Sequence, residues 1–545
     1  MTVRVGVEQQ FIEAKVGLSL FDCAERLGIP ITNSCYKQGT CRECLVEVLA
    51  GGDQLSPRSV EEQHLRGRFR LACRAHILDS ANVVRFRPLR RGVVRILDRG
   101  EELPAIRDRL PFDPAVTRDG RTVLLDGEPL DQADGPLHGL AVDAGTTTVV
   151  VRLVDLETGE VRATQSFENP QCFAGSEIMS RIAYFPSDDE GLLQRTLIAY
   201  VNQAILAFPC QINSIYEVAV AGNSTMRDLF FGLDVRSLGQ SPYRSSSEHE
   251  LNAGRRTTTR LAAGAHALGL CKNPKARAYG LPLVGGHVGA DAAACLLAID
   301  AANEDRLIAL MDIGTNTELL IGNRKRMLAA SCPAGPAFEG GLINCGMPAF
   351  PGAIEAVELD GDGSPSCRVI GDGEAQGICG SGLVDVLGEL LRVQRMNLLG
   401  RIGAERFLLD RDAEVYLTEE DISQLAQAKA AQAAGWTLGM NHYGAQFDDL
   451  EQLYLAGGFA SHLDVDAAQR IGLIPPVPHE RIRQVGNAAI EGATLALLSR
   501  TLRERLESFV LSIAHIELET DADFFDAFVE GCQFKPLRQR SRGEA

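Results

Sequence analysis

The stretch LAVDAGTTTVVVRLV, residues 140–154, reappears in altered form as LMDIGTNTELLIG at residues 310–322. Each copy predicts an apolar strand, an Asp-x-Gly-Thr-x-Thr turn and a second strand, so the chain contains an internal duplication. A tight turn with glycine lets backbone N–H groups and threonine hydroxyls surround a phosphate, while Asp143 or Asp312 can hold a hydrated Mg²⁺. Two such turns facing each other would bind one triphosphate from both sides. The alternative for both aspartates is N-capping or turn formation.

Other glycine-rich segments fit a nucleotide site. LYLAGGFASHL (453–463) predicts an apolar strand ending in Gly457 and Gly458, where backbone can pack flat on a base or ribose because any side chain would collide. NAAIEGA (487–493) begins a late apolar helix, and CPAGPAFEGG (332–341) is a further glycine-rich turn. Helix N-termini attract anions, so we expect some of these turns to face the phosphates.

A second pattern lies near the N-terminus, where CYKQGTCREC (35–44) contains three cysteines. With the cysteine of RLACRAH they give the spacing C-x5-C-x2-C-x28-C, formed by Cys35, Cys41, Cys44 and Cys73. A structural zinc site usually presents two close-set pairs, and the second such pair is missing from this spacing. A plant-type [2Fe-2S] loop, C-x4-C-x2-C with a remote fourth ligand, differs by one residue. The pattern therefore favours a [2Fe-2S] cluster, with zinc or free thiols as alternatives.

The residues around these cysteines have a β-β-α-loop-β order. Val3, Val5 and Val7 alternate as in a strand, SLFDCAERLGI has helical periodicity, and CLVEVLAGG reads as a further strand. This order resembles a β-grasp ferredoxin domain over residues 1–88. The charged and proline-containing residues that follow predict a linker over 89–136, on which a cluster could swing.

Composition limits the function classes. The 545 residues, 45% of them hydrophobic and 23% charged, suffice for several domains with their own cores. The formal net charge of −18 disfavours nucleic acid and anionic membrane surfaces as partners. Without an apolar run of roughly 18 residues or a signal-peptide core, we expect a cytoplasmic protein with reduced thiols. The remaining cysteines are then expected to be small buried hydrophobes: Cys23, Cys172, Cys210, Cys271, Cys295, Cys332, Cys345, Cys367, Cys379 and Cys532.

Together these segments resemble the acetate kinase, sugar kinase, Hsp70 and actin superfamily, whose two ribonuclease-H-like lobes close on ATP and Mg²⁺. The resemblance implies a fold of α+β and α/β class, in which the ferredoxin domain precedes a middle-domain lobe at 137–302, a C-terminal ATPase lobe at 303–536 and a tail at 537–545. It places the first connecting helix at GSEIMSRI (175–182), which makes Glu177 a candidate for positioning the attacking water. A solvated helix residue is the alternative reading of Glu177.

The same resemblance implies which residues contact the ligands. Asp143 and Asp312 would serve the catalytic Mg²⁺ site, and the cluster ligands would be the four cysteines of the N-terminal spacing. One departure is Thr317, which stands where many relatives have glycine. The expected ATP contacts are Gly145, Thr146, Thr147, Thr148, Gly314, Thr315, Asn316, Thr317, Gly457 and Gly458.

The combination of a cluster with an ATPase narrows the function further. A plant-type cluster has a potential of about −400 mV, and each roughly 59 mV of uphill gap costs about tenfold in a one-electron equilibrium. ATP is needed only for an acceptor that is harder to reduce, such as Co(II) in a corrinoid. The order of motifs over residues 1–536 resembles the reductive activators of corrinoid-dependent methyltransferases. That family implies ATP-dependent transfer of one electron from the cluster to an inactive Co(II)-corrinoid protein or methyltransferase, restoring Co(I), with electrons from an upstream donor.

Two other function classes stay open. One is a small-molecule kinase with a fused redox-regulatory ferredoxin domain, although no aspartate stands out as its general base. The other is a nucleotide-dependent, redox-sensing scaffold. The family resemblance also suggests a homodimer.

Four details complete the expectations. Cys532 alone near the C-terminus predicts no second cluster. LTEEDISQLAQAKAAQAAG predicts an amphipathic helix with Thr418 as N-cap and Gly435 as terminator. Trp436 is expected in the core, and His287 is expected in a turn, with cobalt ligation as the alternative.

Overall fold

The computed structural model describes residues 2–539 apart from 8–9, 30, 32–34, 36, 80–82, 90, 93–102, 104–108, 110, 189, 271–272, 315, 372 and 459. Thr315 and Cys271 therefore lie outside the described residues. Each helix among the described residues is either too short or too polar to span a lipid bilayer.

The N-terminal domain has the β-grasp arrangement. Its helix α1 (Leu20–Arg26) begins at a capping box, in which the Ser19 side chain accepts from the Asp22 backbone and the Asp22 side chain accepts from Ser19. Val3, Val5 and Val7 of the first strand are almost fully buried, as the alternation predicts. Gly6, between the last two valines, is also buried. The sheet order is β2 (Gln10–Lys15), β1 (Thr2–Val7), β5 (Val84–Pro88), β3 (Leu45–Ala50) and β4 (Phe69–Leu71).

The two lobes share one strand plan, which confirms the duplication. In each, an antiparallel hairpin carries the Asp-x-Gly-Thr turn, a third antiparallel strand continues the sheet on one side, and a parallel strand joins on the other. The first set is β10 (His138–Ala144), β11 (Thr148–Asp155), β12 (Val161–Glu168) and β13 (Ile215–Ala221). The second is β16 (Ile308–Asp312), β17 (Thr317–Asn323), β18 (Arg326–Cys332) and β24 (Gln452–Ala456).

Further strands extend these sheets or form small ones. The first sheet continues through β14 (Leu261–Gly264) and β15 (Arg277–Gly280), and the second through β25 (Ile482–Gly486) and β26 (Ala514–Ile516). Two small sheets belong to the second lobe: β19 (Ala353–Leu359) with β20 (Pro365–Val369) and β21 (Gly377–Ile378), and β22 (Arg406–Asp410) with β23 (Val415–Thr418).

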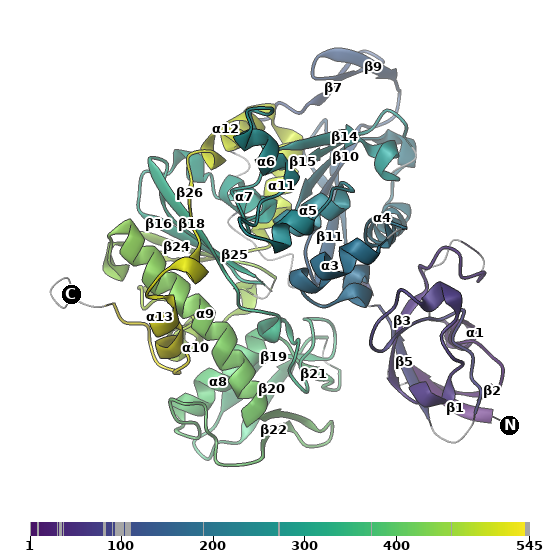
Figure 1. Ribbon diagram of the computed structural model, residues 1–545, viewed down its shortest axis with the longest axis vertical. Helices are drawn as coiled ribbons and strands as arrows, with labels where there is room; N and C mark the ends of the chain where they lie inside the picture. The colour runs from purple at the N-terminus through teal and green to yellow at the C-terminus, as the bar shows by residue number, and fades with distance from the viewer. Residues whose placement is uncertain are drawn as a thin grey trace.

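Helices cover both sheets, as Figure 1 shows. Around the first sheet lie α3 (Ile178–Tyr184), α4 (Leu192–Leu206), α5 (Ser224–Phe230), α6 (Ser246–Asn252) and α7 (Ala290–Ala298). The later helices are α8 (Gly380–Arg392), α9 (Glu419–Tyr443), α10 (Val465–Ile471), α11 (Ala488–Leu498), α12 (Arg500–Val510) and α13 (Phe524–Gly531).

The helices between the two sheets are α7 and α11, which share one buried apolar cluster with residues of both sheets. They pack so closely that a Cβ on Gly492 would overlap with the backbone of Ala294. This corrects the expectation that residues 175–182 supply the first connecting helix. That segment forms the short α3, which packs instead against Pro170–Ala174 and Arg236–Gly239 on the side of the first lobe.

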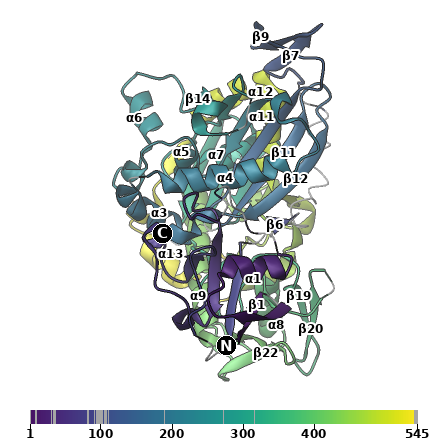
Figure 2. The ribbon, with the colours of Figure 1, turned by 90° about the vertical axis from the view of Figure 1, so that its right-hand side faces the viewer.

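The segment expected to be a linker contains more structure than its composition indicates. β6 (Arg91–Gly92) pairs with β12 and joins the sheet of the first lobe. Strands β7 (Val116–Asp119), β8 (Thr122–Leu125) and β9 (Glu128–Gln132) form an antiparallel sheet at one end of the molecule (Figure 2). Asp113 accepts a 2.8 Å hydrogen bond from the Thr501 hydroxyl, which ties this segment to α12.

Helix α9 begins as expected and ends later. Thr418 and Asp421 form the predicted capping box, but the helix continues past Gly435 to Tyr443 and ends at Gly444, which has φ 83°. The prediction of Gly435 as terminator is wrong. This glycine instead lets α9 approach β18, because a Cβ there would overlap with Cys332 Sγ. Trp436, the next residue, is fully buried, as expected.

Candidate functional site

The two duplicated turns face each other across a pocket between the lobes. It is lined by Asp143 and Gly145 to Thr148 from the first lobe, and by Asp312 to Gly314 and Asn316 from the second. Gly457 and Gly458 complete the wall, so three segments far apart in the sequence meet as expected. Glycine is required at two of these positions: a Cβ on Gly145 would overlap with Thr148 O, and one on Gly457 with Ile313 O.

Buried carboxyl groups crowd this pocket. Burial raises the pKa of Asp143 to about 7, despite a hydrogen bond from Asn487, and raises the pKa of Asp312 to about 6. Burial, with Asp312 nearby, raises the pKa of Asp291 to about 8. Such a group of carboxyls costs free energy when ionised without a cation, and a divalent cation would remove that cost.

Glu318 is the most deeply buried of the acidic residues lining the pocket. It is 3% exposed, and burial raises its pKa well above the usual value. Within the described part of the chain its Oε1 atom has no hydrogen-bond partner. The donor set therefore suits a hydrated Mg²⁺ together with the phosphates of a nucleotide.

Three acidic residues of the pocket were missed from the sequence: Asp291, Glu318 and Glu339. Asp291 lies in the first turn of the apolar helix α7, directly after the glycine-rich GGHVG, a signal that could have indicated it. Glu318 is next to Thr317 in β17, and the strand's alternation decides which of the two faces the pocket. Glu339 lies in the CPAGPAFEGG turn, in which the glycines predict a phosphate turn but nothing local distinguishes the glutamate.

Two predicted residues lie elsewhere. Glu177 is exposed at the N-terminus of α3, accepts a 3.0 Å hydrogen bond from Ser180, and is not among the lining residues of the pocket. Thr317 is fully buried on the other side of β17, where its hydroxyl accepts a 2.9 Å hydrogen bond from Gln432 of α9. The structure thus places Thr317 in contact with α9 and not in the pocket, which accounts for a threonine at that position.

Hydrogen bonds cross the pocket from lobe to lobe. Thr147 Oγ1 donates to Glu339 Oε2 at 2.7 Å, and Asn487 Nδ2 donates to Asp143 Oδ2 at 2.7 Å. On the first lobe, Asn223 Nδ2 donates to Thr146 Oγ1 at 3.0 Å. The polar groups that would meet a triphosphate are therefore already positioned by one another.

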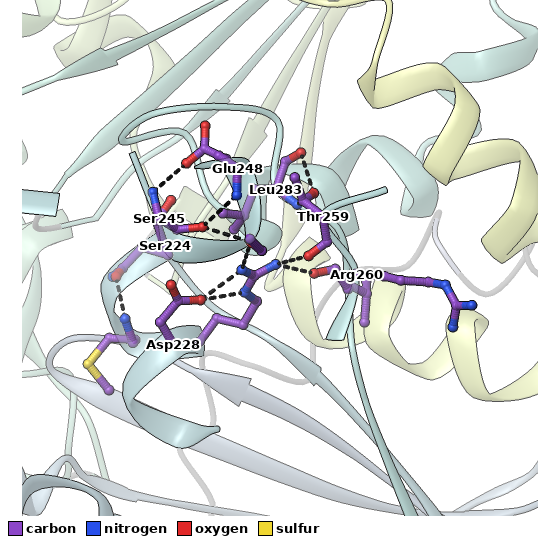
Figure 3. A network of polar contacts seen from close by, with 12 residues as sticks. Ser224, Asp228, Ser245, Glu248, Thr259, Arg260 and Leu283 are labelled. Atoms are coloured by element: carbon purple, nitrogen blue, oxygen red, sulfur yellow. Dashed lines mark hydrogen bonds and ion pairs between the residues drawn. The ribbon is translucent and has the colours of Figure 1, made fainter. Parts of the chain in front are cut away.

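A buried polar network supports the segments behind Asn223 and Asp291 (Figure 3). Arg227 and Asp228 form a fully buried ion pair of 2.7 Å, and Arg227 also donates to Thr259 O at 2.9 Å. Ser224 Oγ donates to Gly286 O at 2.8 Å, while Gly286 N donates to Glu248 Oε1 at 2.9 Å. These bonds fix the loop that leads into α7 and so hold Asp291 at the pocket.

The four N-terminal thiols lie as two pairs, Cys35 with Cys41 and Cys44 with Cys73. Cys44 and Cys73 are buried, with their Sγ atoms 3.3 Å apart. Burial would raise the pKa of Cys35, but hydrogen bonds from Cys41, Thr40 and Gly39 lower it to about 7. Among the described residues, no group of three or more His, Cys, Asp or Glu side chains could hold a single metal ion. In a [2Fe-2S] cluster held by four cysteines, two thiolates bind each iron, and two thiol pairs could supply them.

The remaining cysteines agree in part with their expected role as buried hydrophobes. Cys23, Cys295, Cys332 and Cys379 are buried, whereas Cys172, Cys210, Cys345, Cys367 and Cys532 are half-buried. Cys295 also lies beside the nucleotide pocket, where its thiol is 3.5 Å from Asp312 Oδ2.

Three family models match consecutive parts of the chain. The 2Fe-2S iron-sulfur cluster binding domain matches residues 3–78. The RACo middle region matches residues 138–304, and the C-terminal domain of RACo, the ASKHA domain, matches residues 306–541. The order is a ferredoxin domain followed by a nucleotide-binding ASKHA fold.

Curated proteins and a solved structure show the same relationship. The chain is 32% identical to the corrinoid activation enzyme RamQ of Eubacterium limosum over 443 residues, covering 75% of this chain and 72% of that protein. It is 25% identical to the [Co(II) methylated amine-specific corrinoid protein] reductase of Methanosarcina barkeri, covering 71% and 75%. The solved reductive activator for corrinoid, iron-sulfur protein superimposes with a TM-score of 0.72 at 26% identity, covering 98% of this chain and 99% of that one.

Proposed function

The chain belongs to the family of reductive activators of corrinoid proteins, and on this premise we propose that it is an ATP-dependent one-electron reductase. It would take up an electron at its N-terminal domain and deliver it to the Co(II) corrinoid of a partner protein or methyltransferase, restoring Co(I). The observation that carries the proposal is the presence, in one chain, of two facing phosphate turns and two pairs of neighbouring thiols.

In this proposal the pocket between the lobes holds ATP with Mg²⁺. Backbone N–H groups of the two glycine turns and the hydroxyl of Thr147 would bind phosphate oxygens. Asp143 and Asp312 would hold the hydrated Mg²⁺, which neutralises phosphate charge when it is bound. Their raised pKa values mean that binding of the cation releases protons.

We assign the positioning of the attacking water to Asp291. Its carboxyl lies in the pocket at the start of α7, and a cation bound beside it would favour the ionised form that accepts a proton. Glu177, the residue suggested by the family resemblance, is exposed on α3 and lies outside this pocket.

Cys35, Cys41, Cys44 and Cys73 would hold the [2Fe-2S] cluster. A cluster bound there supplies one electron at a time. The chain's own contribution is the thiol pairs and the amides of Gly39 and Cys41, which hydrogen-bond the Cys35 sulfur and stabilise its thiolate. ATP would act by closing the lobes and changing the affinity for the corrinoid partner, which requires nucleotide states that differ in how well they bind it.

The test is anaerobic mixing of the reduced protein with a Co(II)-corrinoid protein, with and without MgATP. We expect the Co(I) absorption band to appear only with MgATP and to be lost in the Cys73→Ser variant. Equal Co(I) formation with and without nucleotide would contradict the proposal.

A further inference from the structure

The N-terminal domain is seated on the first lobe beside α3 and α4 (Figures 1 and 2). One ionic contact between them comes from the cysteine loop itself. Arg42, which lies between Cys41 and Cys44, forms a 2.8 Å ion pair with Glu190, just before α4. In the next position, Glu43 O accepts a 3.2 Å hydrogen bond from the Tyr200 hydroxyl of α4. The segment between the second and third thiols therefore faces the lobe.

Three further contacts join the N-terminal domain to the first lobe. His64 meets the ring of Phe173 edge-on, with ring centroids 5.4 Å apart. The Arg66 guanidinium lies over the Tyr184 ring at 5.2 Å. Arg87 bridges Glu47 of its own domain and Glu168 of the lobe, at 2.8 and 2.7 Å. The domain thus presents arginines to a lobe surface made of carboxylates and aromatic rings.

The contact surface between the N-terminal domain and the first lobe, which we call the seat, has features of a reversible contact. The Arg42–Glu190 pair is partly exposed, because 51% of the Glu190 side chain is accessible, so salt weakens it. The Arg87–Glu168 pair is more buried, with 21% and 11% of the two side chains accessible. Interfaces between domains of one chain resemble transient protein–protein interfaces. Because β6 joins the sheet of the first lobe directly after the domain, the two surfaces stay at a high effective concentration and reassociate readily.

The lobe side of the seat also reaches the nucleotide pocket. Phe173 and Tyr184 belong to the segments that carry Asn169 and Arg181. Asn169 Nδ2 donates to Gly145 O at 2.8 Å, and Arg181 Nη2 donates to Thr146 O at 2.7 Å. The same two segments therefore touch the cysteine domain on one side and the first phosphate turn on the other.

We propose that this seat is a latch. When the domain is docked, α4 covers the Cys41–Cys44 side of the cysteine loop, and electron exchange with a partner protein requires release of the Arg42–Glu190 contact. The proposal rests on the proposed function for the identity of the cluster. Its test, however, needs neither ATP nor a corrinoid protein, so failure of the latch and failure of the proposed function are distinguishable.

The test uses the full-length, cluster-loaded protein and the variant Glu190→Arg, which places like charges at the latch. Hydrogen–deuterium exchange is followed in residues 37–47 and 192–206. We expect exchange there to rise at least threefold and to return to the wild-type level when Arg42→Glu is added. Glu190 also lies 3.6 Å from Arg195 within the lobe, so Arg195→Gln is the matched control that leaves the latch intact.

The second readout is oxidation of the reduced cluster by one-electron acceptors of different size. Each event moves one electron from the [2Fe-2S]⁺ state to ferric iron of the acceptor. With a small acidic haem protein as oxidant, we expect Glu190→Arg to react at least threefold faster than wild type, whereas ferricyanide reacts equally with both. Unchanged exchange in Glu190→Arg, or equal rates with the haem protein, would overturn the latch.

Discussion

Thr147 of the first lobe donates a 2.7 Å hydrogen bond to Glu339 of the second lobe, across the pocket in which the phosphates are proposed to bind. A carboxylate at this position repels a phosphate unless a cation lies between them. The contact therefore links the closure of the lobes to the charge state of the bound nucleotide.

The variant Glu339→Gln keeps a hydrogen-bond acceptor for Thr147 and removes the charge. We expect it to bind ATP more tightly than wild type in the absence of Mg²⁺, by about 1 kcal/mol or roughly fivefold in Kd. Isothermal titration calorimetry with and without Mg²⁺ checks this, and the exposed Glu480→Gln serves as control. Weaker binding by Glu339→Gln without Mg²⁺ would contradict the repulsion.

The variant Asp291→Asn tests the residue proposed to orient water. We expect the ATP hydrolysis rate to fall by roughly 10²-fold or more, because the proton acceptor is lost, while nucleotide affinity changes little. Glu177→Gln is the matched control and should hydrolyse ATP at the wild-type rate. If Glu177→Gln were inactive and Asp291→Asn active, the residue that orients the attacking water would be Glu177 and not Asp291.

The pocket carboxyls predict how stability depends on pH. Burial raises the pKa of Asp143, Asp312 and Asp291 to about 7, 6 and 8, above the ordinary value of 3.8. Groups with raised pKa values contribute stability that is present below pH 4 and lost as the pH rises through their folded pKa values. Their contribution to the free energy of unfolding therefore falls between about pH 4 and 8.

This fall is measured as the difference in unfolding temperature between wild type and Asp291→Asn, without Mg²⁺ or nucleotide. We expect the unfolding temperature of the variant to rise relative to that of wild type as the pH rises, because the variant has no carboxyl to ionise at position 291. Addition of MgATP should remove most of the difference, since the cation compensates the ionised carboxyls. A difference that is constant from pH 5 to 8 would contradict the raised pKa values.

Cys73 tests the cluster site. We expect Cys73→Ser to bind less than half of the iron of wild type and to lose the visible absorption bands after anaerobic reconstitution. Cys23→Ala, which changes a buried cysteine of the same domain, should keep both. Iron analysis and visible spectra distinguish the two, and full iron content in Cys73→Ser would exclude this residue as a ligand.

Gly435 tests the packing of α9 on the second sheet. Gly435→Ala improves intrinsic helix propensity but places a Cβ against Cys332 Sγ, so we expect a net loss of about 1–3 kcal/mol in the free energy of unfolding. Urea unfolding measures the loss. The double variant with Cys332→Ala should recover part of it, and a stabilised Gly435→Ala would show that the helix and sheet are less closely packed.

The sequence predicted those parts of the site that are formed by residues close together in the chain. The repeated Asp-x-Gly-Thr turns predicted the two-lobed fold and brought Asp143 and Asp312 to one pocket, and the cysteine spacing predicted a ferredoxin domain that the family model confirms. Spacing suffices in these cases because a loop of fixed length determines where its own backbone amides and thiols lie.

Only the tertiary structure decided which residues from separate segments share the site. Asp291 and Glu339 reach the pocket through the packing of α7 against α11 and through the closure of one lobe on the other, which no local pattern records. The same holds for Thr317, turned toward Gln432, and for Arg42, held by Glu190. Local sequence sets backbone conformation over a few residues, whereas burial and contact between distant segments depend on how the whole chain packs.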